Sequence, residues 1–180
     1  MSLQSRDVRL IDALEGRTGL TLDRIVWRVV REGRDPSECS ANGGRWDDSS
    51  FDVLYTSCER EGSIAEMRFH LMKGQPLIPS KVKFNLYELR LQLENVLDLS
   101  SQEALRDLGM DLATYGRLSY GDHRGEYPQP QQISEVAHFH GHDGLLVPSA
   151  RAECSNVVIF CGRISPDQIE TLKDHGKVVW

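Results

Sequence analysis

The longest regular pattern in the sequence runs from Lys81 to Leu99 and includes VKFNLYELRLQLENVLDL. Apolar and polar residues alternate there with a period of two, which places the apolar side chains on one face of an extended chain. The pattern predicts one long strand, or two strands joined near residues 88–92. A segment of this kind needs strand partners and a cover for its apolar face, so the chain must fold around a β-sheet.

Further strands are expected where short runs are rich in β-branched, aromatic or other apolar residues and are bounded by turn residues. These runs are residues 24–30 (RIVWRVV), 53–56 (VLYT), 144–149 (GLLVPS) and 156–162 (NVVIFCG). Helical spacing or capping residues predict helices at 3–15, 59–72, in SSQEALRDLG after the long strand, in PQPQQISEVAHFHGH and at 165–175. The irregular order of helices and strands predicts one α+β (mixed α/β) domain over residues 1–180, with a split central β-sheet flanked by helices.

Two segments have no clear periodicity. The polar segment 31–46 (REGRDPSECSANGGRW) is too long to be a simple connection, and we expect it to have a functional role. Residues 111–127 are expected to be a mixture of helix and loop.

The charge balance limits the class of ligand. Of 180 residues, 21 are Lys or Arg and 27 are Asp or Glu, which gives a formal net charge of −6. This is the wrong sign for a protein that neutralises a run of phosphates, so direct nucleic-acid binding is not expected. A few arginines that converge in one pocket can still hold a small anion. The sequence has no GxGxxG after a strand and no GxxxxGK[ST], so a nucleotide would be held without a glycine-rich phosphate loop.

The cysteines and the N-terminal segment indicate a location. Cys39, Cys58, Cys154 and Cys161 form no CxxC pair, and a domain of this size does not need disulfides, so we expect reduced cysteines. No segment has the apolar length of a signal peptide or a membrane span. The sequence therefore predicts a cytoplasmic protein that does not bind membranes.

Three alternating histidines, His138, His140 and His142, suggest a metal site at first sight. They lack the separated pairs of ligands that a zinc site usually has. We therefore expect no bound metal.

Several motifs in a fixed order resemble those of the RES-domain family. They are WR (27–28), GGRW (43–46), LYTS (54–57), IAEMRFHL (64–71) and GLLVPSAR (144–151), with YPQPQQISEVAHFHGHDG and NVVIF (156–160) in the expected places. The resemblance covers residues 24–162. It implies a fold similar to that of the ADP-ribosyltransferases and a toxin of a bacterial toxin–antitoxin pair. It also implies that NAD⁺ is the substrate and that its nicotinamide–ribose bond is cleaved.

The resemblance and the chemistry together assign five catalytic residues. Cleavage of the nicotinamide–ribose bond builds positive charge on the ribose, and Glu66, in the middle of a predicted helix, is the candidate carboxylate that stabilises it. Arg28 and Arg45 are candidates for gripping the pyrophosphate, since planar guanidinium groups bind phosphate oxygens in pairs. The alternative for Arg28 is an internal salt bridge. Tyr55 is a candidate for stacking on nicotinamide, or else a core residue. Ser149 is expected to donate a hydrogen bond to Glu66 or to the ribose, and not to act as a nucleophile.

Further residues of the same motifs are weaker candidates. Trp46 and Asn156 are expected to line the NAD⁺-binding cleft together with the two arginines, Tyr55 and Ser149. His70 is a candidate for the same cleft. For Trp46, Asn156 and His70, packing or support of a helix end is an equally good interpretation.

Three hypotheses for function remain open at this point. The preferred one is a toxin that destroys NAD⁺ as a glycohydrolase or phosphorylase. The alternatives are an ADP-ribosyltransferase that modifies a specific protein, and a silent binding module that has kept the fold. The resemblance implies a cognate antitoxin that covers the cleft and has an Xre-like DNA-binding region of its own.

Overall fold

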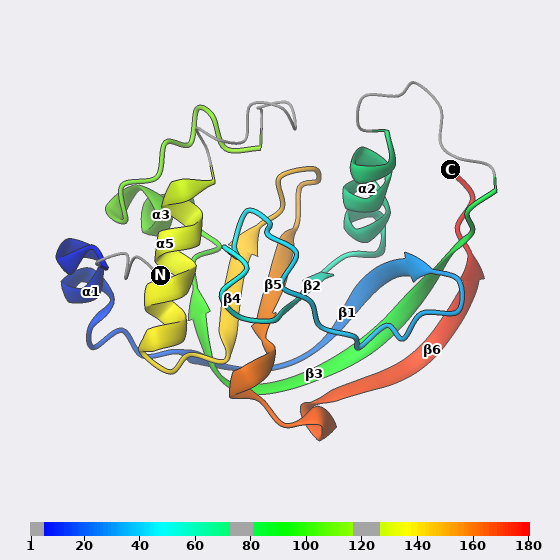
Figure 1. Cartoon of the computed structure of the whole chain (residues 1–180), viewed down its shortest axis with the longest axis horizontal. Helices are drawn as coiled ribbons and strands as arrows, with labels where there is room; N and C mark the ends of the chain where they lie inside the picture. Colours follow the sequence, from blue (N-terminus) through cyan, green and yellow to red (C-terminus); the bar gives the residue numbers. More distant parts are fainter. Residues whose placement is uncertain (1–5, 73–80, 117–126) are drawn as a thin grey trace.

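The computed structural model describes residues 6–72, 81–116 and 127–180 of the chain. Its helices and strands are arranged around one six-stranded sheet (Figure 1). The helices are α1 (Val8–Leu14), α2 (Arg60–Leu71), α3 (Gln102–Asp107) and α5 (Pro128–Phe139), with short 3₁₀ turns η2 (Cys161–Arg163) and η3 (Pro166–Gln168). The strands are β1 (Leu20–Arg31), β2 (Val53–Ser57), β3 (Phe84–Asp98), β4 (Gly144–Pro148), β5 (Ser155–Phe160) and β6 (Ile169–Lys177).

The long alternating segment forms one strand, β3, and this strand connects the two halves of the sheet. Along most of its length β3 pairs antiparallel with β1 on one side and with β6 on the other. At the end of β3, Val96 to Asp98 pair in parallel with Gly144 to Leu146 of β4. Strand β4 then pairs with β5, and β5 pairs with β2, both antiparallel. A single pair, Trp27 and Ser57, connects β1 to β2. The predicted α+β class with a split sheet is therefore confirmed.

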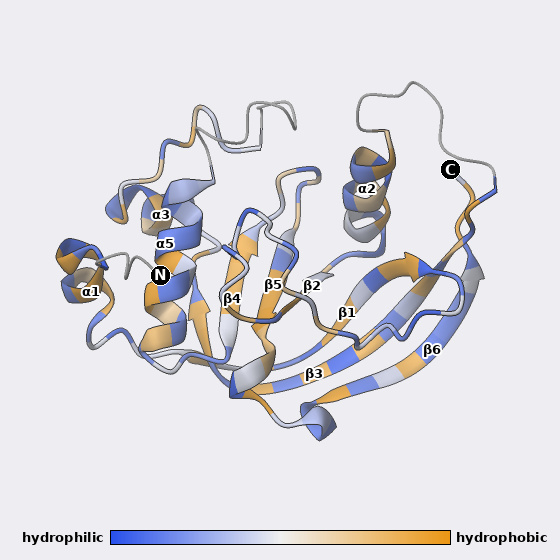
Figure 2. Ribbon diagram, viewed as in Figure 1, coloured by the Kyte–Doolittle hydropathy of each residue, from blue (hydrophilic) through white to orange (hydrophobic). Residues whose placement is uncertain are grey.

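Helices cover the two halves of the sheet separately. Ile133, Val136 and Ala137 of α5 are at most 1% exposed and pack over β4 and β5, where hydrophobic residues gather (Figure 2). Ile64, Met67 and Leu71 of α2 pack on the core formed by Val29, Phe84 and Leu86 of β1 and β3. Figure 1 shows α1, α3 and α5 at one end of the molecule and α2 at the other.

The N-terminal helix is shorter than expected, and part of the prediction lies outside the described residues. Helix α1 begins at Val8 after the cap residue Asp7, whose side chain accepts a hydrogen bond from the Arg9 amide. Leu10 and Leu14 are buried, whereas Val8 is 64% exposed. Of the mixed segment predicted at 111–127, residues 117–126 also lie outside the described part.

The predicted C-terminal helix at 165–175 is wrong. Ser165 and Gln168 form the expected capping box, but the helix stops after the single 3₁₀ turn η3. The chain then continues as β6, which pairs with the free edge of β3 from Leu91 back to Asn85. The β-branched residues Ile169 and Thr171 favour a strand. The edge of β3 presents unpaired backbone N–H and C=O groups, and β6 satisfies them by pairing there.

The expectation that all the cysteines are reduced is also wrong. Cys39 and Cys161 form a disulfide across 122 residues of sequence, while Cys58 and Cys154 are free thiols. The disulfide attaches the long polar segment before β2 to the end of β5. It therefore restrains one side of the cleft described below.

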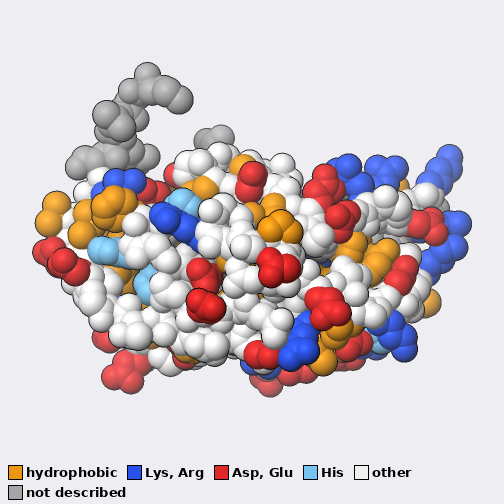
Figure 3. Space-filling view, turned by 90° about the horizontal axis from the view of Figure 1, so that it is seen from below, with side chains coloured by type: hydrophobic (Ala, Val, Ile, Leu, Met, Phe, Trp, Pro, Cys, Tyr) orange, Lys and Arg blue, Asp and Glu red, His pale blue; other side chains and the backbone are white. Residues whose placement is uncertain are grey.

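Charged side chains are unevenly distributed on the surface. Acidic side chains are scattered across the face drawn in Figure 3, and several Lys and Arg side chains gather at the end where β3 begins. Within the described ranges, no helix has the length and apolar character needed to cross a membrane.

Candidate functional site

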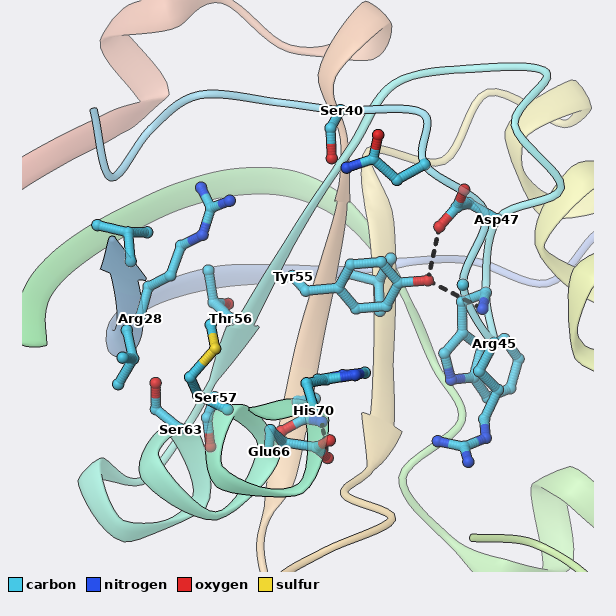
Figure 4. A pocket seen from close by; sticks show the side chains of 18 of the residues that line it. Arg28, Ser40, Arg45, Asp47, Tyr55, Thr56, Ser57, Ser63, Glu66 and His70 are labelled. Carbon is cyan, nitrogen blue, oxygen red and sulfur yellow. Dashed lines mark hydrogen bonds between the residues drawn. The ribbon is translucent and has the colours of Figure 1, made fainter. Parts of the chain in front are cut away.

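A cleft of about 750 Å³ lies among α2, β1, β2, β5 and the segment from Arg34 to Asp47 (Figure 4). This volume is in the range of small-molecule binding sites. The predicted residues that line it are Arg28, Arg45, Trp46, Tyr55, Glu66, His70 and Asn156. Ser149 belongs to the same site through its contact with Glu66. The fold thus gathers these eight predicted residues from widely separated stretches of sequence.

Glu66 has two oxygens in different environments. Its Oε1 accepts hydrogen bonds from Ser149 Oγ at 2.9 Å and from Asn156 Nδ2 at 3.2 Å. No described residue donates to its Oε2. The carboxylate, on the cleft-facing side of α2, is therefore held by one oxygen while the other remains able to accept a hydrogen bond from a ligand.

The Ser149 hydroxyl is oriented by the backbone that follows it. Its Oγ accepts hydrogen bonds from the amides of Arg151 at 3.1 Å and Ala152 at 3.2 Å. With its lone pairs engaged, the hydroxyl directs its single proton to Glu66. The predicted hydrogen bond between Ser149 and Glu66 is present, and this geometry fits a residue that orients the carboxylate.

Tyr55 presents its ring to the cleft while its hydroxyl is fully engaged. The hydroxyl donates to Asp47 Oδ2 at 2.9 Å and accepts from the Trp46 amide at 3.0 Å. Burial of the phenol and the neighbouring Asp47 charge raise the pKa of Tyr55 well above its usual value of about 10. The hydroxyl therefore stays protonated, and the ring face is the part of Tyr55 that a ligand can contact.

Asp47 was not found from the sequence, although it organises the turn that carries Arg45. It is 2% exposed, and its Oδ1 accepts from the Gly43 amide at 2.8 Å. Its backbone carbonyl accepts from the Gly44 amide at 2.9 Å, which closes the turn. A Cβ on Gly44 would clash with the Tyr55 hydroxyl, so glycine is required there. The only signal in the sequence is that Asp47 directly follows the GGRW motif.

The guanidinium of Arg45 lies close to two aromatic rings. Its carbon lies 5.1 Å from the centre of the Tyr115 ring and 5.4 Å from that of Tyr127. At these distances the cation is attracted by the negative faces of the rings. The rings therefore restrict where this cation can point.

Arg28 lies at the other side of the cleft. Its Nη1 donates to the carbonyls of Pro36 at 2.6 Å and Glu38 at 3.0 Å, and among the described residues it forms no ion pair. Burial lowers the pKa of Arg28 to about 10, partly offset by the charges of Glu38 and Asp35, so the group is charged at neutral pH. Figure 4 shows Arg28 and Arg45 on opposite sides of Tyr55, so the two guanidinium groups do not form one clamp.

Trp46 and Asn156 contribute in different ways. Trp46 is 2% exposed and packs in the core beside Tyr115, so it serves the site mainly through its backbone amide. Asn156 holds Glu66 through Nδ2, while its Oδ1 is buried and accepts no hydrogen bond from a described residue. Arg151, also missed from the sequence, stacks on Phe69 with its guanidinium carbon 3.4 Å from the ring centre.

Two of the three alternating histidines, His138 and His142, occupy separate environments. His138 stacks on Phe51 with ring centres 4.4 Å apart, and His142 is buried with its Nδ1 3.1 Å from Asn95 Oδ1. Burial lowers the pKa of both groups. No cluster of three potential metal ligands occurs in residues 6–72, 81–116 and 127–180.

Comparison with known proteins gives a structural match and a family match for this chain. The fold matches a chain of the crystal structure of the M. tuberculosis MbcT–MbcA toxin–antitoxin complex, with a TM-score of 0.80 and 20% sequence identity. The match covers 94% of this chain and 92% of that one. No curated protein matches the sequence significantly. The family model of the RES domain matches residues 25–180, which include the whole cleft, and the chain therefore belongs to the RES-domain family.

Proposed function

We propose that this protein cleaves the nicotinamide–ribose bond of NAD⁺ as the toxin of a toxin–antitoxin pair. The observation that carries the proposal is Glu66, whose Oε1 is fixed by Ser149 and Asn156 while Oε2 has no donor among the described residues. A carboxylate held in this way is suited to stabilise positive charge that develops on a ribose and to accept a hydrogen bond from a ribose hydroxyl.

The other cleft residues fit a dinucleotide substrate. The flat face of Tyr55 offers a stacking surface for the nicotinamide ring. Arg28 and Arg45 supply positive charge on opposite sides of that ring, so they would contact different parts of NAD⁺ rather than grip one phosphate together (Figure 4). No metal is needed in this scheme, because all the groups are supplied by the chain.

Transfer of ADP-ribose to a protein is the alternative outcome of the same bond cleavage. Several residues at the rim of the cleft are exposed, including Arg34, Asp35, Glu38 and Asn42. An exposed rim allows a protein side chain to approach the ribose, as water or phosphate would in hydrolysis or phosphorolysis. A silent binding module is least favoured, since it would have no need for an oriented carboxylate.

The structural neighbour supports a proposal for the partner. That neighbour was solved as a toxin–antitoxin complex. We propose a cognate antitoxin that covers the cleft and carries an Xre-like DNA-binding region, since this chain has a net charge of −6. The toxin would act in the cytoplasm, where NAD⁺ is available.

The test is to incubate the purified protein with NAD⁺ labelled in its adenosine half and to separate the products. Free nicotinamide with ADP-ribose or a phosphorylated ADP-ribose supports NAD⁺ destruction. Label that becomes attached to an added cell extract supports transfer to a protein. Unchanged NAD⁺ under both conditions would contradict the proposal. Expression without the antitoxin is expected to stop growth and to deplete cellular NAD⁺.

A further inference from the structure

The turn from Gly43 to Asp47, which carries Arg45, is attached to helix α5 by the side chain of Gln131. The Nε2 of Gln131 donates to the Gly44 carbonyl at 2.7 Å and to the Asp47 carbonyl at 3.0 Å. These two carbonyls flank Arg45 in the sequence. One side-chain amide thus holds both sides of the turn.

The turn is also stiff within itself. The Gly43 amide donates to Asp47 Oδ1, the Gly44 amide to the Asp47 carbonyl and the Trp46 amide to the Tyr55 hydroxyl. A stiff turn moves as a unit, so its position is decided by the groups that attach it to the rest of the protein. Asp47 and Tyr55 fix its shape and its place beside β2, and Gln131 fixes its place against α5.

Helix α5 is a firm base for this attachment. Ile133, Ser134, Val136 and Ala137, on the same helix as Gln131, are at most 1% exposed. Ile133, Val136 and Ala137 pack in the core over β4 and β5. Because the helix is anchored in the core, the amide of Gln131 has a defined position.

We infer that Gln131 is a positioning residue, which sets the place of Arg45 in the cleft without contacting the substrate. The inference rests on the proposed function in one respect, namely that Arg45 binds the dinucleotide. Loss of the Gln131 amide would let the turn shift, and Arg45 would meet the substrate less often in the correct position. The expected effect is on substrate binding more than on bond cleavage, because the contacts of Glu66 do not involve Gln131.

The chain provides a matched control on the same helix. Gln129 Nε2 donates to the Leu108 carbonyl at 2.8 Å, so Gln129→Ala removes a similar side-chain hydrogen bond away from the cleft. We expect Gln131→Ala to raise KM for NAD⁺ about tenfold, with kcat within about threefold of the wild type. Gln131→Glu, which keeps the shape but removes the N–H donors, should behave in the same way. Gln129→Ala should leave both constants unchanged. Equal kinetics for Gln131→Ala and Gln129→Ala would overturn the inference.

A second measurement does not depend on catalysis. Backbone hydrogen exchange at Gly43, Gly44 and Trp46 should be faster in Gln131→Ala than in Gln129→Ala, with similar thermal unfolding of both variants. If Gln131→Ala fails to fold, Gln131→Glu takes its place. Unchanged exchange at these three amides would contradict the inference. If the wild type releases no nicotinamide, the proposed function fails, while the exchange comparison still decides whether Gln131 holds the turn.

Discussion

The Ser149 hydroxyl donates a 2.9 Å hydrogen bond to Glu66, 83 residues away in the sequence. The Ser149 Oγ accepts hydrogen bonds from two backbone amides, and Glu66 Oε1 also accepts a hydrogen bond from Asn156 Nδ2. A chain of donors thus runs from the backbone after β4 to the carboxylate on α2. This arrangement makes Ser149 an orienting group for Glu66.

Removal of the serine hydroxyl should therefore weaken cleavage without preventing folding. A hydrogen bond to a charged group contributes about 1.5–3 kcal/mol, so Ser149→Ala should lower kcat for nicotinamide release by about 10- to 100-fold. Ser149→Thr keeps the hydroxyl and should retain most of the activity. Steady-state kinetics of both variants check this. Complete loss of activity in Ser149→Ala would instead indicate that the serine itself reacts.

The raised pKa of Tyr55 predicts a loss of stability in alkaline solution. Below about pH 10 the tyrosine is protonated in both the folded and the unfolded chain. Above that pH the unfolded chain loses the proton first, so the free energy of unfolding falls as the pH rises toward the higher folded-state pKa. Tyr55→Phe should reduce this dependence. Urea unfolding at pH 8 and above pH 10 gives the change in the free energy of unfolding between the two pH values. An equal change in the wild type and in Tyr55→Phe would contradict the prediction.

Arg28 is expected to serve both the substrate and the segment before β2. Arg28→Ala removes a charge from the cleft and the donor to the Pro36 and Glu38 carbonyls. KM for NAD⁺ should rise by about 10- to 100-fold. Arg24, exposed on the same strand, is the matched control, and Arg24→Ala should leave KM unchanged. A normal KM in Arg28→Ala would remove this residue from the site.

The disulfide predicts a defined thiol count. Because Cys58 is buried, the thiols are counted after unfolding in denaturant, where two, Cys58 and Cys154, should react without reductant and four after reduction. Cys39→Ser or Cys161→Ser should lower the free energy of unfolding by about 2–4 kcal/mol. A Cys58→Ser/Cys154→Ser double variant should keep the disulfide and serve as the control. Four reactive thiols in the denatured protein without reductant would show that the bond does not form in solution.

Local patterns in the sequence were sufficient to predict most of the fold. The alternation in β3 and the short apolar runs of β1, β2, β4 and β5 arise because these strands bury side chains on a sheet. Such patterns are visible in the sequence without knowledge of the fold. The prediction failed at Ser165–Gln168, where a correct cap was followed by a strand. That outcome depends on the open edge of β3, and no local signal describes a partner 78 to 92 residues away, the separations of Leu91 from Ile169 and of Asn85 from Lys177.

Some residues of the candidate site could likewise be predicted from the sequence, and others could not. Glu66, Arg28 and Arg45 stand in motifs that the sequence displays, so they could be proposed before the fold was known. Asp47 and Gln131 could not be, since their roles consist of contacts with turns and carbonyls that only the folded chain creates. The pairing of Cys39 with Cys161 was missed for the same reason.

The most direct test of the account is the rate of nicotinamide release by Glu66→Gln. This change keeps the size of the side chain and a hydrogen-bonding group at Oε1, but it removes the negative charge that would stabilise the ribosyl centre. We predict that kcat falls by at least about 100-fold while thermal stability and ADP-ribose binding stay close to those of the wild type. Nicotinamide release at the wild-type rate would contradict the central claim that the Glu66 carboxylate drives cleavage of NAD⁺.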